Sequence, residues 1–203
     1  MSGKSKVNGV ASPQIEIIDA IDDPKYEQFL YWCIIHRRAK WIPITSYTDY
    51  ENDFRYRYLK AAIPKGFHKK VLFLNGDYVA MIEYASAEVS GYPITNDSVI
   101  VMNCIWVLRK DRGNNYAKLL IQEMMDSEKE ASGFATIGLE NHWTVWLKRK
   151  QMEGLGFKSV RSIELMHKIR HQGRRFTLHL MWMPVKEGAK PPTWDESKLL
   201  EGT

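Results

Sequence analysis

The chain has 203 residues, of which 44% are hydrophobic and 26% are charged, as in an ordinary globular domain. This length allows one domain with a substantial core, and the sequence has no apolar run that predicts a membrane-spanning helix. The net charge of +5 suits an anionic partner, either nucleic acid or a cofactor with several phosphates.

The two cysteines and the first residues indicate a cellular compartment. Cys33 and Cys104 each have apolar or aromatic neighbours, so we expect buried free thiols in a reducing compartment rather than a disulfide. Residues 1–12 are small and polar and lack the apolar segment of a secretory signal. We therefore predict a cytoplasmic protein that begins with a flexible tail.

The first part of the chain is predicted to contain a strand and two helices. Isoleucines alternate along residues 14–20, which indicates a strand. Asp22-Asp23-Pro24 is typical of a helix start, and this helix should run to about residue 38. A loop over residues 41–47 should lead to a second helix over residues 48–63.

A hairpin and a central strand follow. Two predicted strands, over residues 70–74 and 78–85, are joined by Asn75-Gly76-Asp77, a sequence typical of a hairpin turn. Residues 86–97 should form an exposed loop. The run from Val99 to Val107 is almost wholly apolar and rich in Val and Ile, which predicts a buried strand.

A basic turn separates this central strand from a predicted helix that ends near residue 133. Residues 109–115 are polar and mostly basic or amide-bearing, and Gly113 keeps the backbone accessible. Amides at the start of a helix have no partner within the helix and lie at the positive end of its dipole, so this turn suits a phosphate or pyrophosphate. One helical face then carries Ala117, Leu120, Ile121 and Met124.

The last part of the chain is predicted to alternate strand and helix. The pattern indicates a strand over residues 136–139, a helix over 144–155, and strands over 157–169 and 176–184. The segment from residue 186 contains two adjacent prolines and should be loosely attached, although Trp194, Leu199 and Leu200 are able to dock on the domain or on a partner.

Two motifs in this order resemble a known family. Arg112-Gly113-Asn114-Asn115-Tyr116-Ala117 resembles the acyl-CoA signature of the GNAT N-acyltransferase superfamily, and Leu155-Gly156-Phe157 resembles its late helix-to-strand junction. Asn115 stands where the family usually has its middle glycine, and Asn tolerates left-handed backbone angles, so the turn should be kept. The resemblance covers roughly residues 14 to 184.

The resemblance implies an α/β fold with a mixed, largely antiparallel central sheet of about seven strands flanked by about four helices. The predicted organisation is a flexible tail over residues 1–12, a single GNAT-like acyl-CoA-binding domain over residues 13–185, and a loosely attached tail over residues 186–203. A homodimer is compatible with this organisation.

The resemblance also implies an acetyl-CoA-dependent N-acetyltransferase. Such an enzyme moves an acetyl group to a primary amine by direct transfer, with acetyl-CoA as the co-substrate, and mainly positions the two reactants. Backbone groups of Ile105, Trp106 and Val107 would hold the pantetheine. The residues of the turn would hold the pyrophosphate: Arg112, Gly113, Asn114, Asn115, Tyr116 and Ala117.

The catalytic acid and base are less evident. The tyrosine that many family members use as an acid corresponds to Met152 here, and a usual asparagine corresponds to Val145. Glu83, on a predicted strand, is a candidate base if burial raises its pKa. Glu140 and His142 follow the fifth predicted strand and are further candidates, and water or another group is the alternative.

Other readings remain open from the sequence. Asn115, Val145 and Met152 favour a CoA-binding sensor or assembly module that has lost catalysis. A basic hairpin tip, made of Lys168, Arg170, His171, Arg174 and Arg175, is either a solvated turn or a site for a ribose phosphate or an acidic partner. Nucleic-acid binding has no recognised motif to support it, and the spacing of His167 and His171 on a strand does not predict a metal site.

Overall fold

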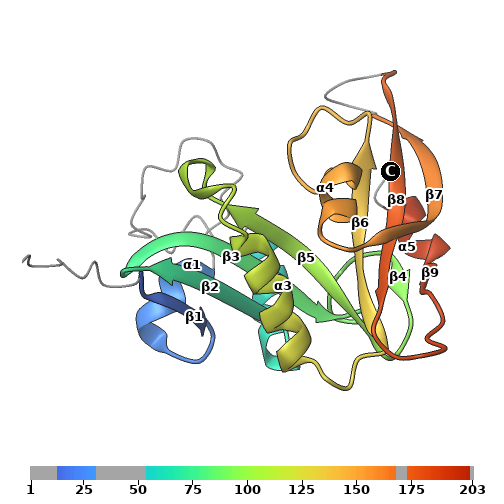
Figure 1. Cartoon of the computed structure of the whole chain (residues 1–203). Helices are drawn as coiled ribbons and strands as arrows, with labels where there is room; N and C mark the ends of the chain where they lie inside the picture. The colour runs from blue at the N-terminus through green and yellow to red at the C-terminus, as the bar shows by residue number, and fades with distance from the viewer. Residues whose placement is uncertain (1–12, 31–53, 168–172, 202–203) are drawn as a thin grey trace, which may run out of the picture.

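The computed structural model describes residues 13–30, 54–167 and 173–201 (Figure 1). The predicted tail over residues 1–12 lies outside these ranges. Most of the first predicted helix, the loop over residues 41–47 and Cys33 also lie outside these ranges. The same is true of three members of the basic tip: Lys168, Arg170 and His171.

The described N-terminal part forms the predicted strand and, within the two predicted helices, short helical segments. Asp23 caps the first segment, because its Oδ1 accepts a hydrogen bond from the Lys25 amide at 3.0 Å and Pro24 fills the first helical position. Gly66, at φ +90°, ends the later segment with a left-handed residue. The elements are β1 (Ile15–Asp19), η1 (Pro24–Tyr26), α1 (Glu27–Leu30), α2 (Phe54–Ala62) and η2 (Ile63–Lys65).

The predicted hairpin and central strand are present. Asn75 and Gly76 both have positive φ, as a tight two-residue hairpin turn requires, and the buried apolar run forms a strand with the bounds that the sequence predicts. The elements are β2 (His68–Leu74), β3 (Asp77–Ser86), β4 (Ile94–Thr95) and β5 (Val99–Val107).

From the basic turn to β8 the elements follow the predicted order, with shorter helices, and two further elements follow that were not predicted. The helix after the basic turn ends at Ser127 rather than near residue 133, because the next strand already begins at Gly133. The elements are η3 (Arg109–Asp111), α3 (Tyr116–Ser127), β6 (Gly133–Glu140), α4 (Arg149–Gly154), β7 (Lys158–Met166), β8 (Arg175–Pro184), β9 (Thr193–Trp194) and α5 (Glu196–Glu201).

Seven strands form one sheet in the order β1-β2-β3-β5-β6-β8-β7, and every neighbouring pair except β5 and β6 is antiparallel. This confirms the predicted fold class. The parallel pair is in register only where Val99–Val101 meets Gly133–Ala135. Beyond that point the two strands diverge, as Figure 1 shows, and the carboxyl end of β5 is left without β6 as a neighbour.

Helices cover both faces of the sheet. α3 packs on one face through Leu120, Ile121 and Met124, against a cluster that includes Ile82 and Met102. On the other face, Phe29 and Leu30 of α1 pack on a cluster with Val71, Phe73 and Met81, and α2 contributes Leu59 and Ala62 to a separate cluster. The core therefore lies on both sides of β2, β3 and β5.

The helix predicted over residues 144–155 is the largest error within the described residues. Only Arg149–Gly154 is helical. Leu147 has φ +44°, and its carbonyl accepts a hydrogen bond from the Leu139 amide at 2.8 Å. The segment before α4 is therefore held along the end of β6 rather than wound into a helix.

The segment after residue 186 is attached more closely than predicted. Thr193 and Trp194 form β9, which pairs with β4 in an antiparallel two-stranded sheet. The side chain of Trp194 packs against the buried cluster that contains Ile94. No helix within the described residues has the length and apolar character needed to cross a membrane.

Candidate functional site

The turn between β5 and α3 has an open, left-handed backbone. Gly113 has φ +91°, and a Cβ placed there would have no atom within 4 Å, so the backbone is accessible at this point. Asn115, which caps α3, has φ +60°. The expectation that Asn115 takes the left-handed conformation in place of glycine is confirmed.

The charges at this turn are mainly positive. The first amides of α3 have no carbonyl one turn earlier to accept their hydrogen bonds, and they lie at the positive end of the helix dipole. The Arg112 guanidinium lies 5.1 Å from the centre of the Trp106 ring, and its Nε donates to the Val107 carbonyl at 3.3 Å. One carboxylate, Asp111, also lies here, and its buried Oδ2 has no hydrogen-bond partner among the described residues.

A first cavity of about 360 Å³ lies between the end of β5, the start of α3 and the segment that precedes α4. The residues predicted to contact the coenzyme all line this cavity, with the exception of Asn114. The Asn114 Nδ2 instead donates a hydrogen bond to the Asp111 carbonyl at 3.0 Å. The lining consists of Ile105, Trp106, Val107, Asp111, Arg112, Gly113, Asn115, Tyr116, Ala117, Lys118, Val145, Trp146, Leu147, Gln151, Met152, Gly154 and Leu155.

The far wall of the first cavity is apolar. Met152, at the position where the resemblance would place a tyrosine, is 2% exposed and packs in the core cluster beside Leu147. Val145 is 57% exposed at the rim. Neither side chain can donate or accept a proton.

A second cavity of about 310 Å³ lies beyond Trp146. It depends on an irregularity in the pairing of β3 with β5: Glu83 pairs with Cys104 and Tyr84 pairs with Met102, which leaves Asn103 as an extra residue. Such a bulge lets two consecutive side chains line the same space. The lining consists of Arg55, Tyr58, Glu83, Ser90, Gly91, Tyr92, Asn103, Cys104 and Trp146.

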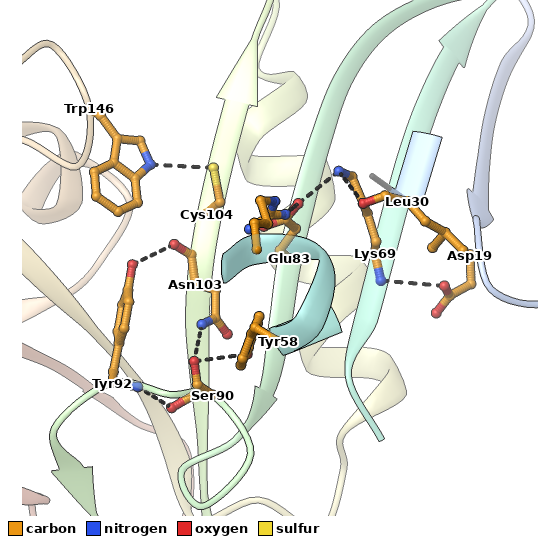
Figure 2. Close-up of polar contacts among 11 residues, drawn as sticks. Asp19, Leu30, Tyr58, Lys69, Glu83, Ser90, Tyr92, Asn103, Cys104 and Trp146 are labelled. Atoms are coloured by element: carbon orange, nitrogen blue, oxygen red, sulfur yellow. Dashed lines mark hydrogen bonds and ion pairs between the residues drawn. The ribbon is translucent and has the colours of Figure 1, made fainter. Parts of the chain in front are cut away.

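Hydrogen bonds fix the polar wall of the second cavity (Figure 2). The Tyr58 hydroxyl donates to the Ser90 carbonyl at 2.8 Å, and the Asn103 Nδ2 donates to the same carbonyl at 2.6 Å. The Tyr92 hydroxyl donates to the Asn103 carbonyl at 2.7 Å. Burial raises the pKa of Tyr58 to about 12, so this phenol is neutral near pH 7. The Oδ1 atom of Asn103 is buried with no hydrogen-bond partner among the described residues.

Glu83, one of the three predicted bases, lines the second cavity, but its pKa is shifted in the opposite direction from the one expected. Its Oε1 accepts a hydrogen bond from the Arg55 Nη2 at 2.5 Å and lies 2.8 Å from the Lys69 Nζ. Burial by itself raises the pKa of Glu83, but the charges of Lys69 and Arg55 outweigh it and lower the pKa below its usual value. The predicted rise in this pKa is therefore wrong.

The other two predicted bases line neither cavity. The Glu140 carboxylate lies 3.3 Å from the Arg149 Nη1 and 3.2 Å from the His179 Nε2. The His142 ring stacks on Trp143, with ring centres 5.3 Å apart, and its Nδ1 accepts a hydrogen bond from the Thr144 amide at 3.1 Å. The structure therefore brings only Glu83 of the three to a cavity.

Several residues of the site were not predicted from the sequence. Asn103 is the polar residue in an otherwise apolar run, a signal that could have indicated a special position. Lys69, which is fully buried, gave no such signal, because its partner Glu83 lies on the next strand. At the basic tip, the described residue Arg175 forms an ion pair with Glu164.

No family model matches the sequence, and a comparison with curated proteins finds no match. Solved structures do share the fold. A candidate GNAT-family acetyltransferase from Desulfovibrio desulfuricans matches 85% of this chain and 100% of its own, at a TM-score of 0.58 and 11% identity. A candidate acetyltransferase from Salmonella typhimurium, solved with its cofactor acetyl-CoA, matches 88% of this chain and 97% of its own, at a TM-score of 0.55 and 16% identity. A candidate acetyltransferase from Acinetobacter baylyi matches 86% of this chain and 95% of its own, at a TM-score of 0.54 and 14% identity. The chain therefore has the fold of the GNAT superfamily.

Proposed function

We propose that the protein is an acetyl-CoA-dependent N-acetyltransferase that moves an acetyl group to a primary amine by direct transfer. The observation that carries this proposal is the pair of cavities on either side of Trp146, the first of which begins at the open turn before α3. A coenzyme in the first cavity would supply an activated thioester, and an amine in the second cavity would attack that thioester at the boundary beside Trp146.

The first cavity fits an acyl-CoA in three respects. The accessible backbone at Gly113 and the amides at the start of α3 suit a pyrophosphate. The cations of Arg112 and Lys118 outnumber the Asp111 carboxylate in the lining. The apolar wall that contains Leu147 and Met152 suits the pantetheine chain. The coenzyme in the Salmonella structure, which shares this fold, supports the same choice of ligand.

The protein's own groups would act mainly by position. The second cavity holds the amine in a site lined by Tyr58, Tyr92 and Trp146, and a fixed arrangement of reactants can supply a large part of a rate enhancement. The low pKa of Glu83 makes it a weak base. The amine proton therefore leaves to water, and Glu83 holds Lys69 and Arg55 in place.

A coenzyme-binding module without catalysis is the second candidate. The observation that favours it is the absence of an acid at Met152 together with the ion-paired state of Glu83. Release of thiol from acetyl-CoA across a panel of primary amines separates the two functions, with coenzyme binding measured in the same preparation. Amine-dependent release supports the transferase, and binding without release supports the module.

We expect coenzyme A to stabilise the folded protein. A ligand present at about 100 times its dissociation constant adds about 2.7 kcal/mol to the free energy of unfolding, which corresponds to a rise in Tm of about 5–10 °C for a chain of this size. Thermal unfolding with and without millimolar CoA or acetyl-CoA measures the shift. An unchanged Tm with both ligands would contradict the proposed ligand.

We also expect the wild-type enzyme to lack an alkaline limb in its pH profile. Met152 cannot protonate the departing thiolate, and a thiol with a pKa of about 8.5 leaves without help, so catalytic efficiency should rise with pH as the amine loses its proton. Met152→Tyr should introduce a fall near pH ~10, where the new phenol ionises. The profile is measured for both proteins, with folding checked at each pH. A wild-type profile that falls near pH ~9 with every amine would assign the acid role to another group, for which Tyr116 in the first cavity is available.

A further inference from the structure

Within the part of the chain that the structure describes, Trp146 alone lines both cavities. Its indole Nε1 donates a hydrogen bond to the Cys104 Sγ at 3.3 Å, as Figure 2 shows. Cys104 lies on β5, and its side chain is buried among the cluster beneath α1. The Trp146 indole, which lies between the two cavities, is therefore hydrogen-bonded to a residue of the central strand β5.

The backbone next to Trp146 is fixed as well. Leu147 is 2% exposed and has φ +44°, and its carbonyl accepts a hydrogen bond from the Leu139 amide at 2.8 Å. The Trp146 amide donates to the Thr144 Oγ1 at 3.3 Å. The indole is thus held through both its ring and its backbone, which fixes its position at the boundary between the cavities.

We infer that Trp146 sets the length of the acyl chain that the enzyme accepts, and that it restricts transfer to short acyl groups such as acetyl. This inference rests on the proposed function. For direct transfer the thioester carbonyl must be open to the second cavity, so we place the acyl group at the boundary that Trp146 occupies. A longer acyl chain would have to displace the indole and break its hydrogen bond to Cys104.

The expected discrimination follows from the cost of fitting extra methylene groups. One methylene in a closed apolar site changes selectivity by about 10- to 200-fold. Hexanoyl-CoA carries four methylenes more than acetyl-CoA and should therefore bind to the wild-type protein at least about 10-fold more weakly. CoA lacks the acyl chain that would meet the indole, so its affinity is the reference against which the affinity of each acyl-CoA is compared.

The test is a calorimetric titration of the full chain with CoA, acetyl-CoA and hexanoyl-CoA, without any amine. Trp146→Ala removes the wall, so the affinity for hexanoyl-CoA relative to that for CoA should rise about 10-fold or more over the wild-type ratio. Cys104→Ala removes the anchor of the indole and should reduce the penalty on hexanoyl-CoA in part. Trp146→Phe keeps an aromatic wall and should lie between the wild type and Trp146→Ala.

Trp143→Ala provides a matched control. Trp143 lies in the same segment and is 50% exposed, and it lines neither cavity, so the three affinities should equal those of the wild type. The inference is overturned if hexanoyl-CoA binds the wild type as tightly as acetyl-CoA does, or if the folded Trp146 variants, Phe included, leave the ratio of the two affinities unchanged. Failure of CoA itself to bind would instead overturn the proposed function.

Discussion

Replacing Ala117 with glutamate should abolish acyl-CoA binding and leave the fold intact. Ala117 lies in the first turn of α3 and lines the first cavity, so the new carboxylate would face the phosphates. Placing like charges side by side costs several kcal/mol, which corresponds to a loss of affinity of about 100-fold or more. A glutamate in the first helical turn is compatible with the helix dipole.

Calorimetric titration with CoA measures this loss, and circular dichroism verifies the fold. Leu119→Glu is the matched control, because Leu119 lies in the same turn of α3 and is 40% exposed, and it does not line the first cavity. It adds the same charge to the same helix and should bind CoA as the wild type does. Equal affinity in Ala117→Glu and the wild type would show that the phosphates lie elsewhere.

Replacing Lys69 with methionine should destabilise the protein strongly. The Lys69 side chain is fully buried, and its Nζ lies 2.8 Å from the Glu83 Oε1 and 3.3 Å from the Leu30 carbonyl. Breaking a buried ion pair by removing one partner costs about 3–5 kcal/mol, because the other charge stays buried. Urea unfolding of the variant measures this loss in the free energy of unfolding. The double variant Lys69→Met/Glu83→Gln removes both charges and should recover part of the lost stability.

A control variant and the pH dependence of stability test this prediction further. Lys25→Met removes an ion pair with Asp23 whose side chains are 64% and 43% exposed, and it should leave the unfolding midpoint unchanged. The folded state lowers the pKa of Glu83 from its model-compound value of 4.5. The stability that its ionised form contributes is therefore complete above pH 4.5 and is lost as the pH falls through the lower folded-state pKa. A loss in Lys69→Met as small as that in Lys25→Met would contradict the structural role of the pair.

The parts of the fold that the sequence predicted are those set by local patterns. The run Val99–Val107 is apolar at almost every position, and this pattern alone is enough to predict a buried strand. Gly113 and Asn115 are residues that accept positive φ, so the open turn before α3 could be predicted from their identity. Asn75 and Gly76 predicted the hairpin turn for the same reason.

The parts that the sequence did not predict depend on contacts between distant segments. The segment before α4 is irregular because the Leu147 carbonyl accepts a hydrogen bond from the Leu139 amide on β6, although the composition of the segment is compatible with a helix. The ionisation state of Glu83 depends on Lys69 from β2 and on Arg55 from α2. The second cavity depends on the pairing of β3 with β5, in which Asn103 is the extra residue. No local pattern encodes such pairings.

A crystal structure of the protein with acetyl-CoA would show directly whether the coenzyme occupies the first cavity. We expect the pyrophosphate to lie against the backbone of residues 113–117, the pantetheine to follow the end of β5 past Trp106, and the acetyl group to end beside Trp146. Acetyl-CoA bound at any other surface of the protein, or absent after soaking at a concentration that saturates a thermal shift, would contradict this expectation.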